Sequence, residues 1–373
     1  MNPQEQFCPN LVCEARGQIG KGNIVIHSRR ERRYKCKQCN STFVERKGSA
    51  LYGLKKPVEL FEIVIGLVAY GCPMAAIVAV YGLDIRTIRA WLKKAGMHCE
   101  GLHRHYLKQK RMDLIHVQAD EIKVKIQAGW VWLASAMMVP TRLWLGGAIS
   151  FKRDVALLKE LVAQVRTVAL CRPLLLAVDG LNSYLGAFRK TFRSPLPRYG
   201  QGGRHKWVAW PGITIVQVIK RISADHFHIE RRIVQGSQTS CDQLLQASRG
   251  GNLINTAFIE RLNATFRQRL CVLVRRTRHL ARKAHTLQSS MFLLGCMYNF
   301  CTHHKSLRLP LYITERRLRW VQRTPAMASA WTDHRWSVLE LLSVKVPPPR
   351  WKPVMKRGRP SKAFLKLVQE WAS

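Results

Sequence analysis

The chain has 373 residues, of which 62 are Lys or Arg and 22 are Asp or Glu, and its formal net charge is +40. Hydrophobic residues make up 47% of the sequence, a proportion that excludes a wholly disordered chain, and the length is enough for two or three domains. So large an excess of cations on a folded chain predicts a polyanionic partner, because phosphate groups relieve the repulsion among Lys and Arg. Nucleic acid is the first candidate and an anionic membrane surface is the second.

The membrane alternative rests on residues 63–83, a run of 21 residues without a formal charge. About 20 residues are needed to span a bilayer, but Gly71 and Pro73 interrupt this run, so two short buried helices explain it better. The amino-terminal residues lack the basic start and apolar stretch of a signal peptide. We therefore expect a cytoplasmic protein with no membrane partner, in which the 11 Cys residues are metal ligands or free thiols.

Residues 1–50 are predicted to be a zinc-ribbon-like module. Two close pairs of Cys are separated by 22 residues, and the spacer carries the turn residues Gly20 and Gly22 and two short strand-like runs, 23–26 and 33–35. Each pair can supply two thiolates to one tetrahedral Zn²⁺. Four free thiols would fit poorly with so small a basic module, which has little apolar core. The predicted zinc ligands are Cys8, Cys13, Cys36 and Cys39.

Residues 51–98 have the pattern of an all-α helix-turn-helix domain. Three apolar helical runs begin near Pro57, Pro73 and Asp84, and Gly82 can end the second helix where Asp84 caps the third. The outer face of the third helix carries cations and a hydroxyl group, which suits the major groove of DNA. A three-helix packing module with a solvated basic face is the alternative. The predicted DNA contacts here are Arg86, Thr87, Arg89 and Lys93.

After a basic connector, residues 99–112, the hydrophobic pattern changes to strand-like alternation. Three strands, a helix, a buried strand and another alternating strand are followed by a helical pattern from Asn255 to about Asn299. This order predicts a mixed α/β domain with one sheet over residues 113–306. The expected strands are 114–120, 130–138, 141–150, 173–178 and 213–222, and the first helix is 154–165.

The remaining residues, 307–373, are predicted to form an irregular, basic C-terminal tail. A proline linker at 347–349 precedes a short Arg-Gly-Arg-Pro segment that resembles an AT-hook, which lies in the minor groove of AT-rich DNA. A solvated tail that binds any phosphate is the alternative. The candidate DNA contacts in the tail are Arg357 and Arg359.

Two Asp residues of the mixed α/β domain stand where predicted strands end. Asp120 ends the first strand, and Asp179 ends the buried strand before Gly180. A carboxylate in such a place is poorly solvated and needs a cation, so two of them on neighbouring strands predict a site for Mg²⁺ or Mn²⁺. Glu121 follows Asp120 directly, but alternation turns it to the other face, and we do not expect it to be a ligand.

A third carboxylate, Glu260, fits the same site. Asn255 can cap the helix that carries it, and Asn263 and Arg267 lie on the same side as Glu260. One helical face would thus offer a metal ligand, an amide and a phosphate-binding cation. An ordinary ion pair between Glu260 and a nearby Arg is the alternative. The predicted apolar stripe of this helix is Phe258, Leu262 and Phe266.

The order of zinc knuckles, helix-turn-helix and an Asp-Asp-Glu constellation resembles that of bacterial insertion-sequence transposases, specifically those related to the insertion-sequence-one type. The matching segments are short, but they occur in one order over most of the chain. They are residues 8–10, 36–43, 45–48, 51–54, 119–121, 178–180, 229–232, 255–263 and 298–301, with His304 and Leu307.

This resemblance implies a ribonuclease-H-like catalytic domain that cuts and joins DNA with two divalent ions. Asp120, Asp179 and Glu260 would be the catalytic triad, and Asp120 would bridge both ions. The partner would be double-stranded DNA, at the terminal inverted repeats of a mobile element and at its target, bound by a homo-oligomer. Because the separation of 81 positions between Asp179 and Glu260 is longer than in compact members of the superfamily, Asp225 and Glu230 are the alternatives to Glu260.

Two other functions would fit parts of the same sequence. A DNA-binding regulator derived from a transposase would keep the zinc module and the helix-turn-helix but would have lost cleavage, and it would have no use for three converging acids. An RNA-processing nuclease on the same fold would share the metal chemistry.

Overall fold

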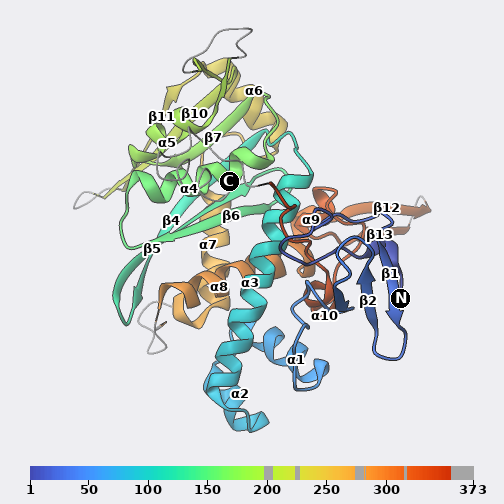
Figure 1. Ribbon diagram of the computed structural model, residues 1–373. Coiled ribbons are helices and arrows are strands. Elements are labelled where there is room, and N and C mark those ends of the chain that lie inside the picture. The colour runs from blue at the N-terminus through green and yellow to red at the C-terminus, as the bar shows by residue number, and fades with distance from the viewer. Residues whose placement is uncertain (197–204, 223–226, 274–280, 282, 315–316, 354–373) are drawn as a thin grey trace, which may run out of the picture. The chain divides into compact units, whose positions relative to one another are not determined.

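The computed structural model describes residues 1–196, 205–222, 227–273, 281, 283–314 and 317–353 (Figure 1). The chain divides into two compact units. One consists of Met1–Gly48 together with residues 347–353, and the other is Ser49–Val346.

The small unit contains a three-stranded antiparallel sheet, which confirms both strands expected in the Cys-rich segment and adds a third. Its strands are β1 (Ile24–Ser28), β2 (Arg33–Cys36) and β3 (Thr42–Val44), and a short 3₁₀ turn, η1 (Pro3–Glu5), precedes them. The proline run expected as a linker lies against Gly17, which has a φ of +66° and whose absent Cβ would come within 2.1 Å of the Pro348 carbonyl oxygen. Glycine is required at that position both by backbone conformation and by space.

The large unit begins with three helices, as expected for residues 51–98. They are α1 (Val58–Ala69), α2 (Met74–Tyr81) and α3 (Ile85–Gln109). Gly82 ends α2 in the left-handed conformation, with a φ of +61°, and the Asp84 carboxylate accepts a hydrogen bond from the Arg86 N–H at 2.6 Å. Helix α3 continues through most of the predicted connector because its apolar stripe extends to the buried Leu107.

None of the described helices combines the length and the apolar character that a bilayer-spanning helix needs. The uncharged run of residues 63–83 falls on α1 and α2, which the Gly71-Cys72-Pro73 segment separates.

A six-stranded mixed sheet forms the centre of the large unit, so the prediction of a mixed α/β domain with one main sheet is confirmed. The strand order is β11-β10-β7-β4-β5-β6; β7 is parallel to both β4 and β10, and the other pairs are antiparallel. The strands are β4 (His116–Ile126), β5 (Gly129–Met138), β6 (Leu143–Ser150), β7 (Leu174–Asp179), β10 (Ile213–Ile222) and β11 (Phe227–Gln235).

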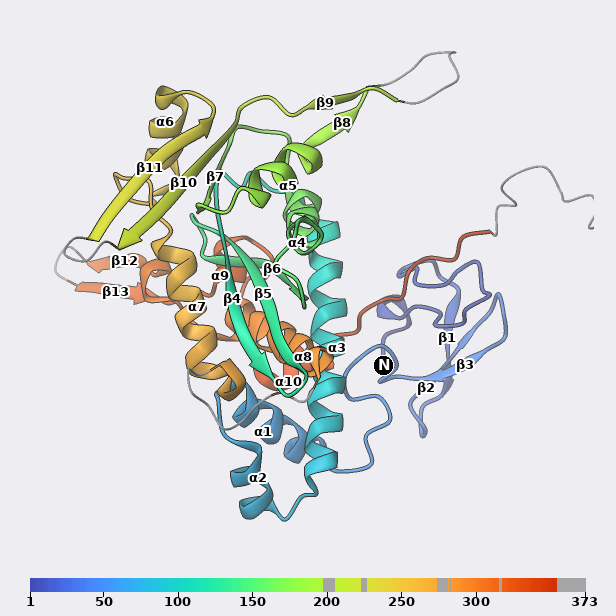
Figure 2. The same ribbon diagram turned by 90° about the vertical axis from the view of Figure 1, so that its left-hand side faces the viewer.

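Helices cover both faces of this sheet. Helices α4 (Val155–Val168) and α5 (Ser183–Thr191) lie on one side, and α6 (Gln238–Ser248) and α7 (Ala257–Arg269) lie on the other (Figure 2). The continuous apolar sequence of β7 follows from this double coverage. Helix α8 (Ala284–Cys296) packs against α3 and β6 and continues into a π-helical turn, η3 (Met297–Cys301).

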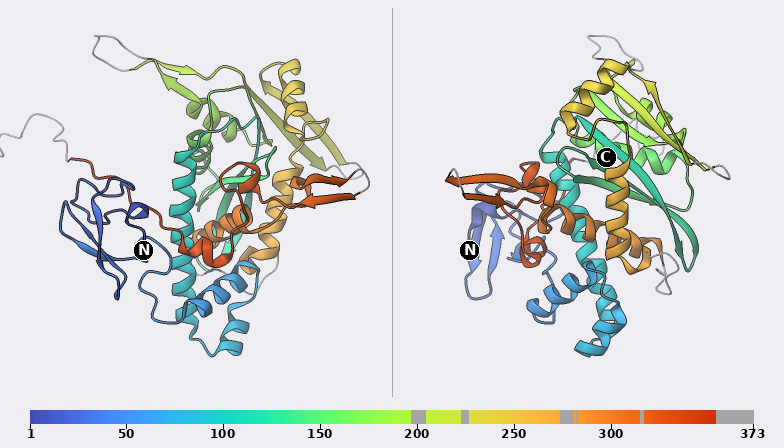
Figure 3. Two further views of the ribbon diagram at one scale, coloured as in Figure 1. Left: turned by 90° about the vertical axis from the view of Figure 1, so that its right-hand side faces the viewer. Right: turned by 180° about the vertical axis from the view of Figure 1, so that it is seen from behind.

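The segment that follows the sheet domain is more ordered than the predicted tail. Residues 309–314 and 317–343 contain strands and helices, and Trp331 and Trp336 are buried, with Trp336 stacked on Phe300 at 4.4 Å. Figure 3 shows the hairpin of this segment extending from the body of the large unit. The elements of this segment are β12 (Leu309–Thr314), β13 (Arg317–Val321), α9 (Pro325–Ala328) and α10 (Val338–Ser343). Elsewhere in the large unit, β8 (Arg193–Pro195) and β9 (Trp207–Ala209) form a second hairpin. The short 3₁₀ turns are η2 (Cys271–Leu273) and η4 (Lys305–Leu307).

Candidate active site and zinc site

Strand register brings Asp120 and Asp179 together at one edge of the sheet. In the parallel pair of β4 and β7, Gln118 is opposite Ala177, and this pairing ends two residues before the two aspartates. Because side chains alternate along a strand, both aspartates point to the side of the sheet that α6 and α7 cover. The prediction that these two acids lie on adjacent strands is confirmed.

An open cleft of about 560 Å³ lies above this edge of the sheet. Glu260, from the first turn of α7, lines the cleft together with both aspartates, so the structure brings the three predicted acids into one cavity. The lining residues that carry charge or hydroxyl groups are Asp120, Arg153, Asp179, Lys220, Thr256 and Glu260.

Asp120 is held by two hydrogen bonds, one from its own strand and one from α7. The Glu121 N–H donates to one carboxylate oxygen and the Asn263 amide donates to the other, both at 2.8 Å. Burial raises the pKa of Asp120 above its ordinary value, and the negative charge of Asp179 adds to this shift, although the Glu121 N–H bond opposes it. The structure thus places the Asn263 amide beside the acids, where the predicted helical face had put it.

Glu121 is closer to the acidic group than the sequence suggested. It does point to the opposite side of the sheet, where the Tyr184 hydroxyl of α5 donates to it at 2.8 Å. Carboxylate oxygens of Glu121, Asp120 and Asp179 nevertheless lie within 4.8 Å of one another, so the geometry allows Glu121 to be a ligand as well. The long Glu side chain reaches the end of the sheet, which strand alternation alone does not take into account.

Arg153 pairs with two of these carboxylates. Its guanidinium donates to Glu121, whose side chain is fully buried, and to Asp179 at 3.0 Å. Arg153 follows β6 and precedes α4, far from both acids in sequence. No local pattern indicated its position, because the contact depends on the packing of α4 against the sheet.

Glu260 lies across the cleft from the two aspartates and has partners of its own. Lys220 of β10 forms an ion pair with it, and the Thr256 hydroxyl donates to it at 2.6 Å. Burial alone would raise the pKa of Glu260, but the hydrogen bonds from Lys220 and Thr256 outweigh that effect and hold the pKa below its ordinary value. The predicted alternative of an ion pair with Arg is replaced here by a pair with Lys.

The helix that carries Glu260 is attached to β4 through Gln118, a residue that the sequence analysis missed. The Gln118 side chain is fully buried; its oxygen accepts from the N–H groups of Phe258 and Ile259 at 3.0 Å, and its amide donates to the Asn255 carbonyl at 2.8 Å. Gln118 therefore satisfies donors at the start of α7, while the Asn255 side chain accepts from the Ala257 N–H at 3.1 Å. The sequence offered one indication of this role: Gln118 is an amide two positions before Asp120, and therefore on the same face of the strand.

The predicted buried stripe of α7 is confirmed at Leu262 and Phe266, but Ile259 takes the place of Phe258. Ile259, Leu262 and Phe266 are buried, whereas Phe258 is only half-buried and stacks under the Arg142 guanidinium at 3.8 Å. Arg267 is half-buried on the same helix.

The acids fit a divalent cation. Asp120, Glu121 and Asp179 have oxygens within 4.8 Å of one another and share one cation, Arg153, which leaves an excess of two negative charges. Glu260 lines the same cleft beside Lys220 but does not belong to that group. Oxygen ligands of this kind suit Mg²⁺ or Mn²⁺. The pKa values of Asp120 and Glu121 are raised by burial and by the charge of Asp179, as expected of carboxylates that lack a full complement of positive charge.

Glu230, one of the two alternatives to Glu260, does not line the cleft. Glu230 lies on the edge strand β11, where it pairs with Arg221 at 3.2 Å. Asp225 lies outside the described residues, as do Arg357 and Arg359.

The predicted DNA contacts of α3 lie near its amino terminus. Arg86, Arg89 and Lys93 are exposed and Thr87 is half-buried. Arg89 and Lys93 also line a surface cavity of about 520 Å³ together with Lys283 of the segment that precedes α8.

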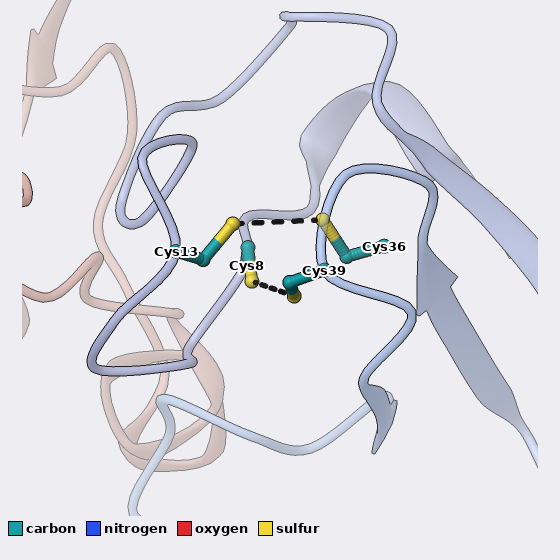
Figure 4. Close-up of side chains that lie close together, drawn as sticks. All are labelled: Cys8, Cys13, Cys36 and Cys39. Atoms are coloured by element: carbon teal, nitrogen blue, oxygen red, sulfur yellow. Dashed lines mark hydrogen bonds between the residues drawn. The ribbon is translucent and has the colours of Figure 1, made fainter.

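The four predicted zinc ligands converge in the small unit (Figure 4). Their sulfur atoms all lie within 4.8 Å of one another, with 3.6 Å between Cys8 and Cys39 and 3.9 Å between Cys13 and Cys36. A tetrahedral site with Zn–S distances of about 2.3 Å requires sulfur atoms about 3.8 Å apart, so this group can hold one Zn²⁺. The Asn23 amide donates to the Cys36 sulfur at 3.2 Å and supports that ligand from outside.

The pKa values of two of the thiols, Cys8 and Cys39, are shifted in opposite directions. Burial raises the pKa of Cys8. Burial also acts on Cys39, but hydrogen bonds from Ser41 and Asn10 outweigh it and lower the pKa of that thiol to about 6. A thiol that is deprotonated near neutral pH is a ready metal ligand.

Comparison with protein-family models and with curated proteins gives no match for this chain.

Proposed function

We propose that this protein is a DNA transposase of the Asp-Asp-Glu class, which binds the ends of a mobile element and catalyses metal-dependent strand cleavage and strand transfer. The observation that supports this most directly is the convergence of Asp120, Asp179 and Glu260 on one cleft from β4, β7 and α7. An antiparallel β6-β5-β4 meander continued by parallel β7 and β10 is the arrangement expected of a ribonuclease-H-like domain.

When bound, two divalent ions would activate the attacking hydroxyl group and stabilise the leaving oxygen of the cut strand. Asp120, Asp179 and Glu260, which line one cleft, would hold these ions. Asn263 keeps the Asp120 carboxylate oriented, and Gln118 keeps α7 at a fixed position relative to β4. Glu121 would offer a further oxygen ligand beside Asp120 and Asp179.

Arg153 and Lys220 are cations that line the cleft, and each pairs with a carboxylate there. They would also bind oxygens of the phosphate that is cut. Positioned cations of this kind stabilise charge that develops in phosphoryl transfer.

DNA is the proposed partner because the chain carries a net charge of +40 and exposes Arg86, Arg89 and Lys93 along one helix. The small unit would be a zinc-binding module held together by its four thiolates. Binding of two element ends and a target would require a homo-oligomer on DNA.

The test is a cleavage and strand-transfer assay with labelled duplexes that carry the sequences flanking the gene, with Mg²⁺ or Mn²⁺, beside RNA of the same sequence. We expect DNA cleavage that is lost in Asp120→Asn, Asp179→Asn and Glu260→Gln, each by more than about 100-fold, with binding to the ends retained. Cleavage of RNA alone would indicate a processing nuclease, and tight DNA binding without cleavage would indicate a regulator.

Glu230→Gln is the matched control, since it removes a carboxylate from the alternative position outside the cleft. It should retain strand transfer. An inactive Glu230 variant beside an active Glu260 variant would overturn the assignment of the third acid.

A further inference from the structure

We propose that a second cavity, on the far side of α7 from the acids, binds an unpaired nucleotide of the DNA strand, with its phosphate held by cations and its base stacked on aromatic side chains. This inference rests on the proposed function and adds a ligand and a site to it.

The cavity has a volume of about 790 Å³ and lies between α7, the turn after β5, the η3 segment and the β12–β13 hairpin. Figures 2 and 3 both show that hairpin beside α7. Helix α7 therefore separates the two cavities: Glu260 lines the acidic cleft, while its neighbour Arg261 lines this one. A volume of this size suits one nucleotide, and a paired duplex does not fit.

The cavity is strongly cationic. Arg142, Arg261, Arg269, Lys305 and Arg308 line it, and no carboxylate does so among the described residues. In the part of the chain that the structure describes, none of these five side chains forms an ion pair with an acid. Five cations in one partly enclosed cavity repel one another, and a phosphate group would relieve that repulsion.

His304 adds a hydrogen-bonding group and little charge. Burial lowers its pKa, and the cations Arg142 and Arg261 lower it further. Its Nδ1 lies 3.0 Å from the Ser306 hydroxyl. The ring thus stays neutral near pH 7 and can donate or accept a hydrogen bond at the edge of a base.

The aromatic lining distinguishes this cavity from a simple phosphate-binding surface. Arg142 stacks on Phe258 at 3.8 Å and Arg308 stacks on Trp320 at 3.9 Å, and Tyr298 completes the wall. Trp320 is 42% exposed, so a ligand can reach it. Unpaired bases stack on aromatic rings and on guanidinium planes, whereas the bases inside a duplex already stack on their neighbours.

The experiment compares two duplexes of one sequence, one fully paired and one with three unpaired nucleotides that include 2-aminopurine. Binding to the full-length zinc-loaded protein is measured by anisotropy without added Mg²⁺. We expect the overhang duplex to bind about tenfold more tightly, within the range for one stacked base, and the 2-aminopurine emission to change on binding. Trp320→Ala should remove both the preference and the emission change.

Arg308→Ala and Arg319→Ala form a matched pair, because both remove one cation from the β12–β13 region but only Arg308 lines the cavity. Arg308→Ala should reduce the preference for the overhang, and Arg319→Ala should preserve it. Equal affinity for both duplexes, or equal losses in the two Arg variants, would overturn the inference. An overhang preference without any Mg²⁺-dependent cleavage would leave this site standing and remove the transposase proposal, and cleavage without the preference would do the reverse.

Discussion

Gln118 connects the strand and the helix that carry opposite sides of the acidic cleft. Its side-chain oxygen accepts two N–H groups at the start of α7, and its amide donates to the Asn255 carbonyl, all inside a fully buried position. We expect Gln118→Leu to lower DNA cleavage by about 10- to 100-fold and to cost about 1–3 kcal/mol of stability, because it leaves two buried N–H groups without an acceptor.

The measurement that separates positioning from folding is the Mg²⁺ concentration for half-maximal cleavage, which should rise when Glu260 is displaced from Asp120. Gln164→Leu is the control. Gln164 donates a hydrogen bond of 2.9 Å to the Gly147 carbonyl, and it does not line the cleft. A Gln164 variant with the same shift in Mg²⁺ dependence would assign the effect of Gln118 to stability alone.

Single residues of the cleft differ in how far the sequence reveals them. Asp179 could be predicted because it ends β7, and Glu260 because the apolar side of its helix can be recognised in the sequence. Asp120 was expected to end its strand, but it lies in the middle of β4, just beyond the pairing with β7. Arg153 and Lys220 could not be predicted, since Arg153 is 26 positions from Asp179 and Lys220 is 40 positions from Glu260. Those contacts depend on tertiary packing. In a sequence with so many Lys and Arg residues, nothing local indicates which of them pairs with a given carboxylate.

The same limit applies to whole elements. The strands β5, β6, β7 and β10 have alternating or continuous apolar sequences and were predicted within a few residues, whereas β4 continues six residues beyond its predicted end at Asp120, to Ile126. Strand β11 was missed because it is an edge strand whose sequence, Phe-His-Ile-Glu-Arg-Arg-Ile-Val-Gln, is largely polar. Helices α5 and α6 are short, and each buries only a few residues.

The Cys-rich unit is expected to depend on metal for its folded state. Its core consists largely of the four thiols with Tyr34, Phe43 and Ile24, which is too little apolar surface to fold alone. We predict one zinc per chain by elemental analysis, and loss of that zinc together with unfolding of residues 1–48 in the double variant Cys36→Ser, Cys39→Ser.

Cys171→Ser is the control for that experiment, because Cys171 is exposed and lies in the large unit. It should retain the zinc. Protein purified without chelator that contains no zinc would contradict the prediction.

The amino-terminal turns of α3 are expected to read DNA. Replacing Arg86 or Arg89 by Ala should weaken binding to the element ends by about 1–3 kcal/mol if the side chain contacts a guanine, with a smaller effect on random DNA. Arg104→Ala, on the same helix but paired with Glu100, should change neither affinity. Equal losses on cognate and random duplexes in a filter-binding or anisotropy assay would assign Arg86 and Arg89 to the phosphate backbone.

At the scale of the whole molecule, one buried His connects several elements. His103 of α3 packs on Trp144 of β6 at 4.6 Å, contacts Phe292 of α8, and has its Nε2 within 3.0 Å of the Leu145 carbonyl. Complete burial lowers the pKa of His103 to about 4. The unfolded chain therefore binds a proton at this residue near pH 6.5, whereas the folded protein does not.

The contribution of His103 to the free energy of unfolding is therefore highest above about pH 6.5. It falls by up to about 3 kcal/mol as the pH decreases toward 4. Urea unfolding at pH 7.5 and pH 5.0 measures it. His103→Gln should reduce the difference between the two pH values, and His228→Gln, at an exposed position of β11, should not. A pH dependence unchanged in the His103 variant would assign the effect to other groups.

The length of helix α3 can be compared with one turn of the DNA that the protein is proposed to bind. Its amino-terminal turns carry Arg86 and Arg89, its later turns are buried with Leu102 and Leu107 in the core of the large unit, and its 25 residues span about 37 Å. That length is close to one turn of the double helix, about 34–36 Å. If the proposed function holds, a continuous helix of this length would keep the bond to be cut a constant number of base pairs from the sequence that is read.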